Sequence, residues 1–196
     1  MPKRIGSVVY MEKLSLAERS AIPDGFQQHW YRHAAQFVRG KTVLDVGSGS
    51  GCGLPVLTAA GASVVRGIDP LPCGTPVYPR PFGGVAAGTV DLESTAGYDF
   101  VLAVDVLEHV DDDVGFFNHL MRVARVGVFF STPNWNYSHA TNEHHVQEFS
   151  PEELAAFLDA HAAGKRYETW TSDGRCVITK AALSDAKENF GVLVWK

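Results

Sequence analysis

The chain has 196 residues, a formal net charge of −5 and a charged fraction of 20%. This length suits one domain with a substantial core, and the composition excludes intrinsically disordered, collagen-like and coiled-coil proteins. The negative charge disfavours a general binder of nucleic-acid backbones. Cys52, Cys73 and Cys176 fit neither a disulfide framework nor a zinc site. No stretch has the character of a signal peptide or a membrane span, so we expect a cytoplasmic protein.

Short apolar runs alternate with segments of helical period, which predicts an α/β fold with a doubly wound, mainly parallel sheet of seven strands. Helices are expected over 24–39, closed by Gly40, over 54–60, and from the acids at 111–113 onward. Ser150 to Glu153 form a capping box that opens a helix through His161. The seven strands are expected at 42–47, 64–69, 89–92, 100–107, 126–132, 166–171 and 190–195, the last two as an antiparallel pair at the edge.

The most specific motif is VLDVGSGSGCG, an apolar strand followed by glycines at every second position. Glycine lets the backbone approach a ligand closely. A dinucleotide fingerprint that starts at Gly47 would need a third glycine where Cys52 stands. The carboxylate of Asp45 suits a cationic amine and would repel a pyrophosphate. The residues of this candidate ligand-binding turn are Asp45, Gly47, Ser48, Gly49 and Gly51.

Three further motifs follow in order: VRGIDP ends in Asp69, GTVDLES carries Asp91, and YDFVLAVDVLEHV contains Leu-Glu-His. Together with the glycine motif they resemble the class I S-adenosylmethionine (SAM)-dependent methyltransferases between Gly40 and Leu154. The resemblance implies a Rossmann-like sheet and SAM as cofactor, with Asp69 on the ribose hydroxyls and Asp91 at the adenine amino group. The implied cofactor-binding residues are Asp45, Gly47, Ser48, Gly49, Gly51, Asp69, Pro70, Asp91, Leu92 and Asp105.

A second group of motifs concerns the methyl acceptor. Enzymes of this fold that methylate nucleobase amines carry an Asn/Asp-Pro-Pro-aromatic turn, where this chain has Asp-Val-Leu-Glu at 105–108, so an oxygen acceptor is favoured. Asp-x-x-Glu-His with a later His-x-x-Glu-Phe resembles the ubiquinone-pathway O-methyltransferases and the enzymes that methylate the terminal 2′-hydroxyl of small RNAs. That resemblance implies a Mn²⁺ or Mg²⁺ site. Its ligands would be Asp105, Glu108, His109 and His145, with His144 as the alternative to His145.

The same residues fit a reading without metal, in which Glu108 caps locally and His109 or His145 is the general base. A third reading makes the histidines purely structural. Under the first two, Glu108, His109 and His145 are the candidate catalytic residues. Trp30 and Tyr31 lie on the first predicted helix, either in the core or as a lid over the substrate.

The motifs divide the chain, taken as one methyltransferase domain over 1–196, into four parts. These are an N-terminal helical cover (1–39), a cofactor-binding core (40–132), an active-site loop (133–149) and a C-terminal helix and strand pair (150–196). Residues 71–88 are rich in proline and glycine, which predicts a trimmed crossover connection. The long polar stretch at 133–149 predicts a functional loop, which we expect to close over the pocket and bring His145 to Glu108 and His109.

The sequence therefore predicts a SAM-dependent methyltransferase that acts on a hydroxyl of a small molecule or sugar. Two alternatives stay open: 2′-O-methylation of an RNA end, and a catalytically silent SAM-binding subunit of an assembly. An NAD-dependent oxidoreductase is the least favoured. The expected partner is a small-molecule or sugar acceptor, nucleic acid is disfavoured by the charge, no membrane is expected, and these motifs predict neither the acceptor nor the oligomeric state.

Overall fold

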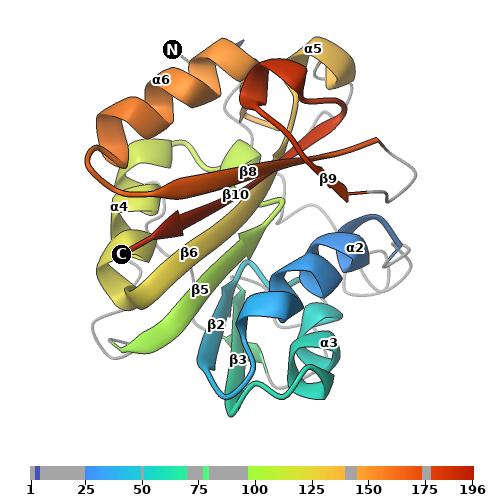
Figure 1. The fold of residues 1–196 in the computed structure, drawn as a ribbon, viewed down its shortest axis with the longest axis vertical. Coiled ribbons are helices and arrows are strands. Elements are labelled where there is room, and N and C mark those ends of the chain that lie inside the picture. Colours follow the sequence, from blue (N-terminus) through green and yellow to red (C-terminus); the bar gives the residue numbers. More distant parts are fainter. Residues whose placement is uncertain are drawn as a thin grey trace.

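A mixed β-sheet with helices on both faces forms the body of the protein (Figure 1). The structure is a computed structural model that describes residues 3–4, 25–49, 51–69, 77–79, 97–139, 145–173 and 178–196. The strands of the sheet are β2 (Thr42–Val46), β3 (Val64–Asp69), β4 (Val77–Pro79), β5 (Tyr98–Val104), β6 (Ala124–Pro133), β8 (Tyr167–Ser172), β9 (Ile178–Lys180) and β10 (Asn189–Trp195). Hydrogen bonds join these eight strands in the order β4-β3-β2-β5-β6-β10-β8-β9.

The strands from β4 to β6 in that order pair in parallel and bring their carboxyl ends to one edge of the sheet. The remaining pairs, β6 with β10, β10 with β8 and β8 with β9, are antiparallel. Open sheets of this kind bind ligands outside the carboxyl ends of the parallel strands. Functional residues are therefore expected just after β2, β3, β5 and β6.

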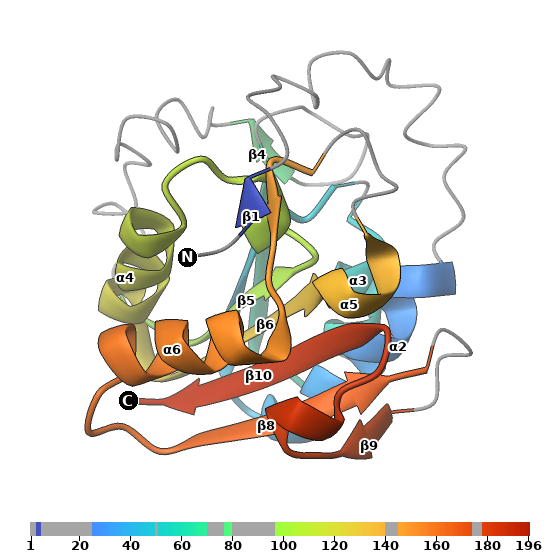
Figure 2. The ribbon, with the colours of Figure 1, turned by 90° about the horizontal axis from the view of Figure 1, so that it is seen from above.

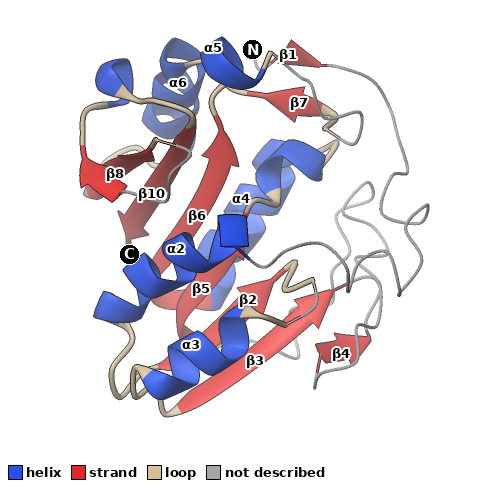
Figure 3. Cartoon of the chain, turned by 90° about the vertical axis from the view of Figure 1, so that its right-hand side faces the viewer, coloured by secondary structure: helices blue, strands red, loops and turns tan. Residues whose placement is uncertain are grey.

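Helices cover both faces of the sheet: α2 (Gly25–Ala34) and α3 (Gly53–Ala59) on one, α4 (Asp113–Val123) and α6 (Pro151–His161) on the other (Figure 1). The shorter helical elements are η2 (Ala35–Phe37), η4 (Leu107–His109), α5 (Trp135–Ser138) and η5 (Leu183–Asp185). β1 (Lys3–Arg4) and β7 (Gln147–Glu148) pair antiparallel as a separate small sheet (Figures 2 and 3). Among the helices of the described ranges, none has the length and apolarity needed to cross a lipid bilayer.

Each face of the sheet has its own hydrophobic core. Phe117 of α4 and Leu158 of α6 are buried against one face. On the opposite face, Trp30 and Tyr31 of α2 are 0% and 1% exposed and pack with Leu57 of α3. Of the two expectations for these aromatic residues, the structure supports the core position and not the lid.

The predicted helices are present, but the first, expected over 24–39, is α-helical only to Ala34 and continues as η2 to Phe37. The hydroxyl of Ser150 accepts the Glu153 N–H at 3.3 Å, and the Glu153 carboxylate accepts the Ser150 N–H at 2.9 Å, which completes the capping box of α6. Val38 is the C-cap of the first helical segment, and Gly40, with a φ of +70°, lies in the turn that leads into β2. The Asp112 carboxylate caps α4 by accepting the Gly115 N–H at 2.8 Å, so this acid serves the helix.

The sheet departs from the prediction at its edges. Six of the seven predicted strands lie in the sheet, and the unpredicted short strands β4 and β9 extend its two sides, which gives eight strands within the described residues. β10 does not lie at the edge but between β6 and β8, which suits its continuous apolar sequence, buried from Phe190 to Val194. The predicted strand at 89–92 and the part of 71–88 outside β4 lie outside the described residues.

The stretch 133–149 is more ordered than the irregular loop we predicted, although 140–144 lie outside the described residues. The single turn α5 follows β6 directly, and β7 lies before α6. Asn134 explains the first of these: its side-chain oxygen accepts the Asn136 N–H at 3.1 Å, and its amide donates to the Lys187 carbonyl at 2.7 Å. One buried side chain thus caps α5 and fastens it to the segment before β10.

Candidate active site

The glycine-rich segment forms the turn between β2 and α3. Gly47, Gly49 and Gly51 have φ angles of +77°, +55° and +80°, in the left-handed region where glycine meets no steric penalty. The N–H groups of Gly47 and Ser48 donate to the Ile68 carbonyl at 2.8 and 3.1 Å, which fastens the turn to β3. A Cβ atom on Gly49 would meet no atom of the described residues within 4 Å. The turn therefore leaves open space beside its backbone, as a ligand-binding turn requires.

Asp45, near the carboxyl end of β2, is fully buried. Its Oδ2 accepts the hydroxyl of Tyr31 at 2.9 Å, and its Oδ1 has no hydrogen-bond partner within the described ranges. Burial raises the pKa of Asp45 to about 7, and the hydrogen bond from Tyr31 opposes that rise. The sequence did not predict this contact, because helical periodicity marks Tyr31 only as an inward-facing residue.

Asp69 ends β3 beside the same turn. Its side chain is buried, and its Oδ2 accepts the Gly49 N–H at 2.8 Å. This bond ties the strand end to the middle of the glycine turn. The ribose-binding role implied by the family resemblance stays a prediction, now with the residue placed next to the turn that would carry the ligand.

The chain leaves β5 by a sharp turn at Asp105, whose φ of +51° is unusual for a residue other than glycine. The predicted strand over 100–107 therefore stops at Val104, and η4 follows. The Asp105 N–H donates to the carbonyl and the hydroxyl oxygen of Ser131 at 3.2 and 3.0 Å, and the Ser131 hydroxyl donates to Asp105 Oδ1 at 2.5 Å. The hydroxyl of Ser131 thus ties the Asp105 carboxylate to β6. Burial raises the pKa of Asp105.

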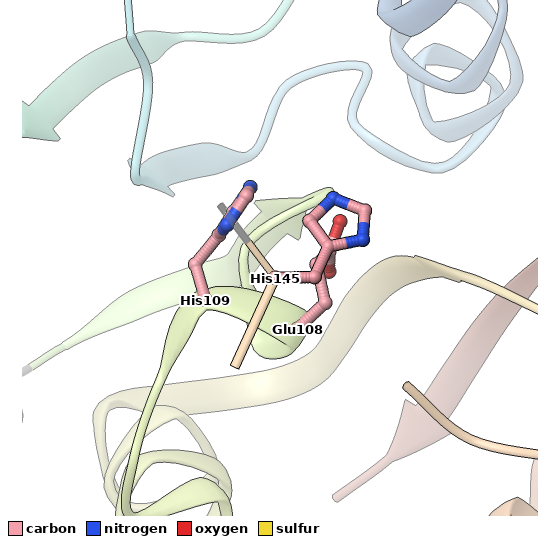
Figure 4. A group of neighbouring side chains, drawn as sticks. All are labelled: Glu108, His109 and His145. Carbon is pink, nitrogen blue, oxygen red and sulfur yellow. The ribbon is translucent and has the colours of Figure 1, made fainter. Parts of the chain in front are cut away.

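Glu108, His109 and His145 lie together at this edge of the sheet (Figure 4). One potential metal-ligating atom of each lies within 4.8 Å of those of the other two. The ring centroids of the two histidines are 4.8 Å apart. Figure 4 shows His145 entering from a separate segment beside the η4 turn that carries Glu108 and His109. The predicted meeting of these three residues is confirmed.

Three hydrogen bonds join η4 to β7 and the residue before it. The Val146 N–H donates to the Glu108 carbonyl at 2.9 Å. The side-chain amide of Gln147 donates to the carbonyls of Leu107 and Val110 at 3.2 and 3.0 Å. Since Gln147 is fully buried, these bonds are shielded from water and hold the two segments in register.

Glu148 supports the cluster from β7 and is fully buried. Its Oε1 lies 2.5 Å from Nδ1 of His145, and its Oε2 accepts the hydroxyl of Ser138. A carboxylate at Nδ1 fixes the orientation and tautomer of an imidazole. Glu148 is a site residue that we did not predict, although its position in the His-x-x-Glu-Phe motif was an available signal.

Glu108 has the most perturbed environment of the cluster. It is 1% exposed, and its Oε2 has no hydrogen-bond partner among the residues that the structure describes. Burial, and to a lesser extent the carboxylates of Asp105 and Glu148, raise the pKa of Glu108 well above its usual range. Its ionised form would gain from a nearby positive charge, such as an imidazolium or a metal ion.

Three of the four predicted metal ligands come together, and Asp105 does not join them. The left-handed turn at Asp105 and its hydrogen bond to Ser131 hold this carboxylate to β6 instead. Of the two histidine alternatives, His145 lies in the cluster. The other predicted residues, His144, Pro70, Asp91 and Leu92, lie outside the described residues.

Comparison with known proteins identifies the family. The family model for a "Methyltransferase domain" matches residues 25–191. The chain belongs to this family. The class I SAM-dependent methyltransferase predicted from the motifs is thereby confirmed, and SAM is the cofactor of the family rather than NAD.

Curated relatives add a narrower similarity. The ubiquinone biosynthesis O-methyltransferase of Paracidovorax citrulli is 34% identical over 113 residues, which are 50% of this chain and 46% of the relative. The enzyme of the same name from Bordetella parapertussis is 34% identical over 121 residues, 55% of this chain and 48% of the relative. This methyltransferase chain thus spans about half the length of these relatives.

Solved structures confirm the fold. A SAM-dependent methyltransferase from Archaeoglobus fulgidus matches with a TM-score of 0.65 and 14% identity, covering 86% of this chain and 92% of that one. The small RNA methyltransferase HEN1 matches with a TM-score of 0.64 and 15% identity, covering 100% of this chain and 27% of that one. At these identities the likeness concerns the fold alone.

Proposed function

We propose that the protein transfers the methyl group of SAM to a hydroxyl oxygen of a small molecule. The observation that carries the proposal is the cluster of Glu108, His109 and His145 beside the glycine turn. Val106, two residues before Glu108, packs against Gly47 of the turn, since a Cβ atom on Gly47 would lie 2.5 Å from the Val106 side chain. A proton-accepting group next to the methyl donor is what methylation of a hydroxyl requires.

The residues present fit SAM. The open space at Gly49 would admit the ligand beside the backbone, and Oδ1 of Asp45, which has no hydrogen-bond partner in the described part of the chain, suits its α-ammonium group. Asp69 lies beside the same turn, where it would meet the ribose. SAM supplies a methyl group on a positively charged sulfur. The predicted contacts of Pro70, Asp91 and Leu92 would complete the site.

In this proposal His145 accepts the proton of the acceptor hydroxyl. Glu148 engages Nδ1 of His145, so proton transfer falls to Nε2. The same carboxylate stabilises the imidazolium that forms. Glu108 and His109 face His145 and would orient the hydroxyl by hydrogen bonding. The chain's contribution is thus orientation of the acceptor and removal of its proton.

A divalent cation bound at the same cluster is the alternative means of activating the acceptor hydroxyl. The donor set of one carboxylate and two imidazoles fits Mn²⁺ or Mg²⁺, and Oε2 of Glu108, which none of the described residues hydrogen-bonds, is available as a ligand. The ion would lower the pKa of the acceptor hydroxyl. Glu108, His109 and His145 would hold it, with Glu148 orienting His145 from behind.

A small-molecule acceptor is supported by two observations. The net charge of −5 disfavours a polyanionic acceptor such as RNA. The curated relatives are named for ubiquinone biosynthesis O-methylation. Methylation of an RNA end is the second candidate, because the Asp-x-x-Glu-His and His-x-x-Glu-Phe motifs also resemble those of the small-RNA 2′-O-methyltransferases.

The test measures release of S-adenosylhomocysteine (SAH) from SAM with phenolic, sugar and RNA acceptors. We expect turnover with a small hydroxylated acceptor, and a fall in kcat of about 100- to 10,000-fold in His145→Ala with unchanged SAH affinity. His161→Ala, at the last residue of α6, is the matched control. A chelator followed by Mn²⁺ or Mg²⁺ distinguishes the metal device from the metal-free base. Full activity in a His109→Ala, His145→Ala double variant would overturn both, and SAH binding without turnover would indicate a silent subunit.

A further inference from the structure

Helix α2 is fastened to the carboxylates of two neighbouring strands. Tyr31 donates its hydroxyl to Asp45 near the end of β2, and Gln27, one helical turn earlier, hydrogen-bonds Asp105 after β5. β2 and β5 pair in parallel with Asp45 opposite Leu102, so Asp105 follows three residues beyond the partner of Asp45, at the same carboxyl edge of the sheet. Residues four apart lie on one face of a helix. α2 therefore presents two donors to this edge.

The contact of Tyr31 is tightly confined. The ring is 1% exposed and lies against the first residue of α3, since a Cβ atom on Gly53 would stand 2.2 Å from it. The hydroxyl points to Oδ2 of Asp45 at 2.9 Å, while Oδ1 is buried without a hydrogen-bond partner in the described ranges. A buried carboxylate oxygen without a donor is costly unless a ligand supplies one.

We infer that Tyr31 is a positioning residue of the cofactor site, whose hydroxyl holds Oδ2 of ionised Asp45 and leaves Oδ1 to the α-ammonium group of SAM. The inference rests on the proposed contact of Asp45 with the cofactor and goes beyond it. Helix α2 would then take part in cofactor recognition. The packing of the Tyr31 ring in the core would not by itself require a hydroxyl group.

The charges around this pair explain why a neutral donor is needed. Burial, and to a lesser extent Asp69 of β3, raise the pKa of Asp45 to about 7 against the opposing effect of the hydrogen bond from Tyr31. Burial and the nearby Asp45, Cys52 and Asp105 raise the pKa of Tyr31 well above its usual value of 10.0. The phenol therefore stays protonated and donates at every working pH. It favours the ionised form of Asp45, the form that a cationic ligand needs.

The pH dependence of binding follows with a definite sign. Below pH 7 Asp45 takes up a proton, so the affinity for a ligand with an ammonium group should fall as the pH falls. Removing the Tyr31 hydroxyl raises the pKa of Asp45 further, because the ionised form loses its donor. Tyr31→Phe should therefore bind weakly at neutral pH and recover toward the parent affinity as the pH rises.

Calorimetric titration with SAH, which carries the α-ammonium group, tests this between pH 6 and pH 8.5. For a rise of about one pKa unit from about 7, we expect Tyr31→Phe to bind about tenfold more weakly than the parent at pH 6 and about fivefold more weakly at pH 7, with the difference nearly gone at pH 8.5. Tyr98→Phe removes the hydroxyl of another buried tyrosine, at the opposite end of β5, and should leave the profile unchanged. A loss in Tyr31→Phe that is equal at all pH values, or no loss, would overturn the inference.

Two further variants keep the outcomes separate. Gly53→Ala keeps the hydroxyl but displaces the ring, and it should shift the profile in the same direction, which serves if Tyr31→Phe fails to fold. Asp45→Asn should bind weakly at every pH. Parent-like binding by Asp45→Asn would show that Asp45 does not bind the α-ammonium group of the cofactor. Weak binding by Asp45→Asn with parent profiles in both other variants would overturn only the role of Tyr31.

Discussion

The cofactor turn and the Glu108–His109–His145 cluster lie at the same edge of the sheet but are held in different ways. The turn is fastened mainly by its own and adjacent backbone, through the Ile68 carbonyl and the carboxylate that ends β3. The cluster joins two segments that are distant in the sequence, and it depends on buried side chains, Gln147 and Glu148. A site held by backbone contacts tolerates substitution of its side chains but not of its glycines. A site held by buried side chains is instead sensitive to substitution of those side chains.

The largest expected effect comes from breaking the turn. Gly49→Val puts a branched side chain into the open space beside the backbone and strains a residue whose φ is +55°, so SAM binding should be abolished. Calorimetry with SAH checks the loss, and circular dichroism checks that the fold persists. Gly164→Val, also at a positive φ with no atom within 4 Å but after α6, is the control and should bind normally. Normal binding by Gly49→Val would show that the ligand lies elsewhere.

The same contrast explains what the sequence could and could not predict. The strand, the glycines and Asp45 of the turn lie within one continuous motif, so local spacing was sufficient. The meeting of His145 with η4 was also predictable, because both segments leave the same edge of the sheet. The Asp105 error has a local cause, since no pattern signalled its left-handed conformation. Tyr31 and Glu148 were missed in their roles because each acts through a partner outside its own periodic pattern.

A smaller effect is expected where the cluster is held by a side chain. Glu148→Ala removes the carboxylate behind His145, and methyl transfer should fall by about 10- to 100-fold with SAH affinity unchanged. Glu148→Gln keeps an acceptor oxygen and should lose less. Glu152→Gln, an exposed acid in the first turn of α6, controls for the change of charge. Steady-state rates at saturating SAM check the split, and a parallel loss of SAH binding in Glu148→Ala would contradict the separation of the two sites.

The smallest expected effect is on the free energy of unfolding, and it comes from Asp45 of the cofactor site. Because burial raises the pKa of Asp45 from 3.8 to about 7, the folded chain keeps a proton between these values that the unfolded chain has released. The free energy of unfolding of the ligand-free protein should therefore fall as the pH rises through this window. Asp45→Asn has no such proton, so its free energy of unfolding should increase relative to that of the parent by about 1–2 kcal/mol between pH 5.5 and pH 8.

Urea denaturation at the two pH values measures this difference. Asp99→Asn is the control of opposite sign: hydrogen bonds from the backbone and side chain of Thr42 lower the pKa of Asp99, so its ionised form stabilises the fold above its ordinary pKa. Asp99→Asn should therefore be less stable than the parent at pH 8. An advantage of Asp45→Asn that does not change with pH would mean that Asp45 is already ionised in the folded chain at acidic pH. The cofactor site would then carry the negative charge that a cationic ligand needs before any ligand arrives.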